Sequence, residues 1–88
     1  MSTHRGHGHC IAKGCDVTGM MLEIYGRRDG LCHGKGGSMH IADPARGMLG
    51  ANAIVGGGPQ IAVGAAIACR NRRDGRVSVA FGGDGSSN

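Results

Sequence analysis

The residues best placed to do chemistry are Gly83, Asp84 and Gly85, which follow a run in which apolar and small residues alternate. This alternation predicts a buried strand over 76–81. Glycines on both sides of Asp84 leave its carboxylate open to a bulky ligand at the carboxyl end of the strand, where open α/β sheets bind ligands. A hard cation carrying phosphates fits this pattern. Asp-Gly is also a common turn pair, so a plain turn is the alternative.

A second group of residues able to do chemistry lies near the N-terminus. Arg5, His7 and His9 stand on a glycine-rich stretch, where arginine can offer a planar fork to phosphate oxygens and histidine can donate or shuttle a proton. This arrangement indicates an anion site, and an exposed polar terminus is the alternative. Imidazole and thiol groups also bind zinc, and the chain carries them at His4, His7, His9, Cys10, Cys15, Cys32 and His33. With no Cys-x-x-Cys and no helical histidine pair, zinc is the less favoured interpretation.

Two glycine-rich segments do not match the common phosphate-binding motifs. In the Walker pattern around Lys35, Asp29 stands where a glycine belongs and Gly36 stands where Ser or Thr belongs. In a dinucleotide fingerprint starting at Gly56, Ile61 stands where the third glycine belongs. A nucleotide P-loop and a Rossmann cofactor are therefore not supported.

The rest of the sequence predicts the elements that must hold these residues. Residues 1–15 form a loop rich in His and Gly. Residues 16–26 form a helix, because Asp16 is a suitable N-cap and apolar residues recur at the spacing of a one-sided helix, which Gly26 ends. Residues 27–58 form glycine-rich loops, and connections of this length are usually functional or disordered.

A second helix is predicted over 59–73. Pro59 is favoured in the first turn of a helix, and the arginines near the end suit the negative pole of the helix dipole. Asp74-Gly75 then turns the chain into the strand over 76–81, which leads to the Gly-Asp-Gly motif at 82–88. Loop, helix, turn and strand in this order form the second half of a βαβ unit, so the sequence predicts an α/β fold with a parallel sheet.

Composition limits both stability and partners. With 88 residues, nineteen glycines, one Phe and no Trp, the chain has little material for a core, and we expect it to be marginal or unfolded by itself. The net charge of +4 comes from arginine clusters without interleaved aromatic residues, which disfavours nucleic-acid binding. No apolar run approaches the roughly 20 residues that span a bilayer, so no membrane partner is expected. The four cysteines match no compact disulfide framework, so we expect reduced thiols and a cytoplasmic protein.

Four motifs together resemble those of a known family. They are His4-Arg5-Gly6-His7-Gly8-His9, Lys35-Gly36-Gly37-Ser38-Met39-His40, Asn52-Ala53-Ile54-Val55-Gly56-Gly57-Gly58 and Gly83-Asp84-Gly85. Their order and spacing are similar to those of the thiamine-diphosphate-dependent 2-oxo acid dehydrogenases, specifically the alpha subunit of the decarboxylating component in pyruvate and acetoin dehydrogenase complexes. The resemblance covers essentially the whole chain. It implies a three-layer thiamine-diphosphate-binding fold with a parallel sheet, of which this chain is an incomplete part.

The resemblance also implies roles for individual residues. Asp84 would bind the Mg²⁺ that bridges the diphosphate of thiamine diphosphate, which agrees with oxygen-only coordination of a hard cation. The backbone of Gly85 and Ser86 would lie against the phosphates. Backbone groups of Ala53 and Val55 would contact the aminopyrimidine ring.

The histidine-rich motif would supply the remaining roles. Arg5 would contact the diphosphate, His4 would stand at a neighbouring cofactor contact, and His7 would line the active site as the catalytic residue. In the family, thiamine diphosphate attacks a carbonyl through its C2 carbanion and stores the electrons released by decarboxylation or carbon–carbon cleavage. The protein would position and polarise the reacting groups.

The sequence departs from the family pattern at two positions and covers only part of it. Ala53 replaces a glycine beside the pyrimidine, and Gly82 replaces a bulky, commonly aromatic residue. The family extends beyond both ends of these residues, and an asparagine that completes the Mg²⁺ site would lie outside them. The beta subunit would supply the glutamate that activates the aminopyrimidine, so we expect no catalysis from these residues alone.

Two functions from different classes follow. The leading interpretation is a fragment of an oxidoreductase alpha subunit that works with beta in an alpha2beta2 heterotetramer. This enzyme would cleave or decarboxylate pyruvate or acetoin and pass the two-carbon unit to a lipoyl group of an acyltransferase component. The alternative is a small non-catalytic protein that binds a metal or an anion through its N-terminal His and Cys residues.

Overall fold

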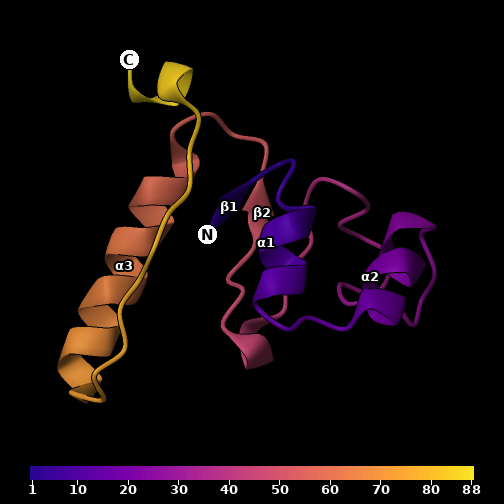
Figure 1. Ribbon diagram of the computed structural model, residues 1–88, viewed down its shortest axis with the longest axis horizontal. Helices are drawn as coiled ribbons and strands as arrows, with labels where there is room; N and C mark the ends of the chain where they lie inside the picture. Colours follow the sequence, from indigo (N-terminus) through magenta and orange to yellow (C-terminus); the bar gives the residue numbers. More distant parts are fainter.

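A short parallel pair of strands lies at the centre of the computed structural model, which describes residues 1–88. The strands are β1 (Ser2–Thr3) and β2 (Ala51–Asn52). The helices are α1 (His7–Ala12), α2 (Val17–Ile24) and α3 (Gly57–Arg72). Figure 1 shows α3 and the last, yellow segment of the chain on one side of the strands and α2 on the other. The chain is therefore a small mixed α/β structure with a parallel sheet.

The two helices expected over 16–26 and 59–73 correspond to α2 and α3. The Asp16 carboxylate caps α2 by accepting the backbone N–H groups of Gly19 at 2.7 Å and Thr18 at 3.3 Å. Gly26 follows the helix with φ 66°, a conformation that favours glycine. The start of α3 lies at Gly57, just ahead of the predicted first residue, and its end lies at Arg72.

The loop that the sequence predicts over 1–15 is wrong in part, because this region contains β1 and α1. Its glycines and histidines have low intrinsic helix propensity, which hides the helix in the sequence. Tertiary packing stabilises it, since Cys10 is fully buried in the core. That core consists of Cys10, Cys15, Met20, Ile41 and Met48.

The region 27–58 is mostly loop, as expected, but it also contains β2 and a single 3₁₀ turn over Pro44–Arg46. The turn forms because Asp43 accepts the N–H of Arg46 and Gly47 takes φ 77° after it. Asp43 and Met48 then form an isolated antiparallel bridge. The long loop is therefore folded back on itself, with Met48 in the core.

The strand predicted over 76–81 is extended chain, but it is not a strand of the sheet. The Met1 amino group donates to the carbonyl oxygen of Val79 at 2.9 Å, and the N–H of Phe81 donates to the Met1 oxygen at 3.1 Å, as in a parallel pair. Nothing in residues 1–88 pairs with its other edge, so the ladder does not extend. The predicted burial is wrong as well, because Val77 is 82% exposed.

The core lies between α1, α2 and the folded loop, and α3 adds little to it. Only Ala62 of α3 is buried. None of the helices combines the length and the apolar character needed to cross a membrane.

Candidate functional site

Three segments that are far apart in the sequence line one pocket of about 450 Å³. It lies where β1, the loop after β2, the start of α3 and the Gly-Asp-Gly turn meet, and Figure 1 shows that yellow turn near the first turn of α3. Its volume falls in the range of small-molecule sites. Of the residues singled out from the sequence, the lining includes His4, Ala53, Val55, Gly85 and Ser86.

The loop between β2 and α3 owes its shape to Asn52, which the sequence analysis did not single out. The Asn52 side-chain oxygen accepts the N–H of Ile54 at 2.9 Å, a local turn that presents Ala53 and Val55 to the pocket. A Cβ at Gly57 would lie 3.0 Å from the Asn52 amide nitrogen, so a larger residue would push the Asn52 side chain aside. Asn at the end of a strand before a glycine run is the signal that could have identified it.

The Gly-Asp-Gly motif forms a 3₁₀ turn over Asp84–Ser87. The hydroxyl and the N–H of Ser86 both donate to the carbonyl oxygen of Gly83, at 2.6 and 3.0 Å. The exposed Asp84 carboxylate accepts no hydrogen bond from the chain, and it stands beside the pocket lining instead of within it. A Cβ at Gly83 or Gly85 would meet nothing within 4 Å, so both flanks of the acid are open.

The departure at Gly82 has a visible consequence in this turn. A Cβ at Gly82 would lie 3.0 Å from the Ser86 hydroxyl oxygen, which is tighter than ordinary contact. Glycine at this position therefore allows the Ser86 side chain to fold back onto Gly83. The other departure, Ala53, is exposed in the pocket lining.

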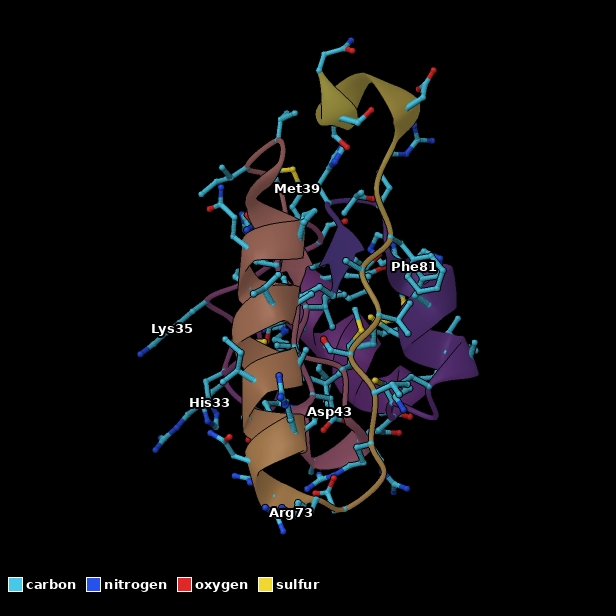
Figure 2. All side chains as sticks on the ribbon, turned by 90° about the vertical axis from the view of Figure 1, so that its left-hand side faces the viewer. His33, Lys35, Met39, Asp43, Arg73 and Phe81 are labelled. Carbon is cyan, nitrogen blue, oxygen red and sulfur yellow. The ribbon has the colours of Figure 1, made fainter.

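The residues of the histidine-rich motif do not all lie at the pocket. His4 lines the pocket, whereas Arg5 is exposed and does not. His7 also lies outside the lining, and its Nε2 is 3.1 Å from the Ser38 hydroxyl. His9 is held by the Ser2 hydroxyl at 2.6 Å and stacks on Phe81 with ring centroids 4.0 Å apart, and Figure 2 labels this ring on the last segment.

The zinc alternative has no ligand set in this structure. No three side chains of His, Cys, Asp or Glu come together in a way that could hold a metal ion. Burial raises the pKa of the Cys10 and Cys15 thiols, which disfavours the thiolate form that binds zinc. All four cysteines are free thiols.

Glu23 is the most constrained acid in the chain, and the sequence analysis overlooked it. Its carboxylate is fully buried and accepts backbone N–H groups from the loop over 32–37. Burial alone would raise the Glu23 pKa, but these donors outweigh it and hold the pKa below its ordinary value. Lys35 of the same loop is directed away from the body of the molecule in Figure 2.

Comparison with known proteins identifies the family. The sequence model of the dehydrogenase E1 component family matches residues 1–88. The chain belongs to this family. It is 64% identical to the alpha subunit of acetoin:2,6-dichlorophenolindophenol oxidoreductase from Bacillus subtilis and 61% identical to that from Cupriavidus necator, in each case over 99% of the chain. It is 45% identical, over 97% of the chain, to the alpha subunit of the pyruvate dehydrogenase E1 component from Zymomonas mobilis.

The match covers nearly all of this chain but only part of each E1 relative. The 88 residues span 26% of the length of the two acetoin relatives and 24% of the pyruvate relative. The resemblance read from the four motifs is thus confirmed at the level of the family and of the alpha subunit.

The pocket suits a ligand that carries phosphates and a divalent cation. Its wall at Gly83 and Gly85 has open space where any other residue would place a side chain. The Asp84 carboxylate has both oxygens free, and one carboxylate together with phosphate oxygens is a usual donor set for Mg²⁺. The residues present therefore fit the thiamine diphosphate and Mg²⁺ that the sequence motifs imply.

Proposed function

We propose that residues 1–88 form one part of the thiamine diphosphate site of an E1 alpha subunit that acts on acetoin. The observation that carries this proposal is the meeting of three separated segments, including the Gly-Asp-Gly turn and the Ala53 to Val55 loop, in one pocket. Acetoin is preferred to pyruvate because the relatives named for acetoin are 64% and 61% identical, against 45% for the relative named for pyruvate.

Each residue of the site has a defined task under this proposal. Asp84 holds Mg²⁺, and the backbone of Gly85 and Ser86 lies against the diphosphate oxygens. Ala53 and Val55 orient the aminopyrimidine through backbone groups. When bound, thiamine diphosphate supplies a nucleophilic carbon and an electron sink.

The histidine-rich motif neutralises charge and handles protons. Arg5 is exposed and directly follows the pocket residue His4, so its guanidinium would be free to bind a phosphate oxygen. His4 contacts the cofactor from the pocket wall. The half-buried His7 donates or accepts a proton at its imidazole, with Ser38 as the hydrogen-bond partner of Nε2.

Larger assembly is part of the same proposal. The parallel pair of β1 and β2, extended by Met1 and the segment 76–81, would belong to the central sheet of a three-layer fold. A beta subunit would complete the active site in an alpha2beta2 heterotetramer. The two-carbon unit from acetoin would pass to a lipoyl group of an acyltransferase component.

A chimeric subunit tests the proposal directly. Residues 1–88 replace the matched stretch of the Bacillus subtilis alpha subunit, and the chimera is expressed with the other subunits of that enzyme. We expect acetoin-dependent reduction of 2,6-dichlorophenolindophenol that requires thiamine diphosphate and Mg²⁺. Asp84→Asn should weaken Mg²⁺-dependent cofactor binding about 100-fold, equivalent to roughly 2.7 kcal/mol, because it removes a charged ligand of the cation.

The matched control is Asp29→Asn, which removes an exposed carboxylate that accepts no hydrogen bond. It should leave cofactor binding and activity unchanged. A folded chimera that binds no thiamine diphosphate, or in which Asp84→Asn binds as tightly as the parent, would contradict the proposal. Activity with pyruvate but not acetoin would contradict the choice of substrate alone.

A further inference from the structure

The side chain of Glu23 lies at the centre of a loop that folds around it. One carboxylate oxygen accepts the N–H groups of Cys32 and Gly34, both at 2.8 Å. The other accepts those of Gly36 at 2.7 Å and Gly37 at 3.0 Å. With 0% of its surface exposed, Glu23 is the only buried charged residue, and its negative charge is balanced by backbone dipoles and not by a cation.

The close packing of this loop against Glu23 and neighbouring backbone requires its glycines. A Cβ at Gly30 would lie 2.5 Å from a Glu23 carboxylate oxygen. A Cβ at Gly36 would lie 2.6 Å from the His40 carbonyl oxygen and 3.3 Å from the other Glu23 oxygen. Gly34 and Gly37 have φ of 75° and 58°, in the left-handed region that favours glycine. The carboxylate and the loop therefore fix each other's positions.

The loop ends at the residue that contacts His7. Ser38 follows Gly37 directly, and its hydroxyl oxygen lies 3.1 Å from Nε2 of His7 in the first turn of α1. Both Ser38 and the loop are otherwise near the surface, and no other side chain hydrogen-bonds to His7. The position of Ser38, and through it the orientation of the His7 ring, depends on how the loop is held.

We propose that Glu23 is a positioning residue that acts on His7 through the loop and Ser38. Glu23 anchors four backbone N–H groups, the anchored loop places the Ser38 hydroxyl, and that hydroxyl holds the orientation of the His7 imidazole. The inference rests on the proposed function, which assigns His7 its catalytic role. The chain of contacts from Glu23 to His7 can be tested separately from activity.

The first measurement follows His7 itself in the chimeric enzyme. Deuterium exchange at the imidazole C2 position, read by mass spectrometry over a range of pH, reports the titration of one histidine. We expect Ser38→Ala and Glu23→Gln to change the exchange profile of His7, and Asp29→Asn to leave it as in the parent. Ser38→Ala keeps the Glu23 anchor intact, so an unchanged His7 profile in this variant overturns the proposal whether or not Glu23→Gln folds.

The second measurement is kinetic. Loss of His7 orientation should lower kcat about 10- to 100-fold in both variants, with less than about a twofold change in the KM for acetoin and in half-saturation by thiamine diphosphate. The double variant should be no slower than Glu23→Gln alone, because both changes act on one path. Multiplicative losses in the double variant, or a loss of cofactor affinity as large as the loss of kcat, would assign Glu23 a merely structural role.

The two proposals fail in different ways. If the parent chimera shows no thiamine-diphosphate-dependent activity but His7 exchange responds to both substitutions, the proposed function fails and the positioning role stands. If the parent is active and His7 exchange responds to neither substitution, the positioning role fails and the proposed function stands.

Discussion

The buried carboxylate of Glu23 makes the stability of its loop depend on pH. Its pKa is held below the ordinary value of 4.5 by four backbone N–H donors, so the opened loop binds a proton more readily than the closed one. The stabilisation of the loop is therefore complete above about pH 4.5 and is lost as the pH falls through the lower pKa of the closed state. At neutral pH, Glu23→Gln should cost about 3 kcal/mol, because two donors lose a charged acceptor.

Amide hydrogen exchange of the loop measures this cost locally. Gly34 and Gly36 should exchange roughly 100-fold faster in Glu23→Gln at neutral pH. After correction for intrinsic exchange, their protection should fall below about pH 4.5 in the parent and be flat with pH in the variant. Equal pH dependence in the two proteins would show that another acid controls the loop.

Single residues differ in how far the sequence alone reveals them. Asp84, Ala53, Val55 and His4 belong to local motifs, and the structure places them in or beside one pocket. The partners of Glu23 are backbone N–H groups, which nearly every residue type has, so the sequence does not reveal them. The pairing of His7 with Ser38 joins residues 31 positions apart, so only the folded chain shows it.

Among the elements, α3 allows a clean test of glycine in a helix. A Cβ at Gly64 would meet nothing within 4 Å, so Gly64→Ala should stabilise α3 by about 0.5 to 1 kcal/mol. A Cβ at Gly57 would lie 3.0 Å from the Asn52 amide nitrogen, so Gly57→Ala should displace Asn52 and destabilise the first turn. Helix content by circular dichroism should rise in the first variant and fall in the second.

Exchange of the Ile54 amide gives the control for these helix variants. The Asn52 oxygen protects this amide at 2.9 Å, and Gly57→Ala should expose it whereas Gly64→Ala should not. A fall in helix content in both variants would mean that α3 packs along its Gly64 face.

A helix or strand could be predicted where the residues that stabilise it lie within one short stretch of the chain. The Asp16 cap and the apolar spacing of α2 are local, and α2 is present. The burial of Cys10 that stabilises α1 depends in part on Ile41 and Met48, which are distant in the sequence, so the sequence indicates only a loop there. The alternation over 76–81 predicts a strand that is buried on both faces. Within residues 1–88, however, only Met1 pairs with this segment.

At the scale of the whole molecule, two parts are weakly joined. The core cluster joins α1, α2 and the folded loop, whereas a groove of about 850 Å³ lies between that body, α3 and the last segment. Apolar side chains on these outer elements are exposed, with Val63 at 60% and Val77 at 82%. Exposed apolar surface of this kind is typical of an interaction face.

This division predicts how the isolated chain unfolds. The 88-residue chain should melt in a broad transition and bind a hydrophobic dye, because α3 and the segment 76–81 can detach without opening the core. In the chimeric subunit the same residues should melt cooperatively with the rest of the enzyme and lose most dye binding. Calorimetry of both proteins measures the difference. A sharp transition of the isolated chain, with a calorimetric enthalpy of about 60 kcal/mol equal to the van't Hoff value, would show that it folds as a unit without covering elements.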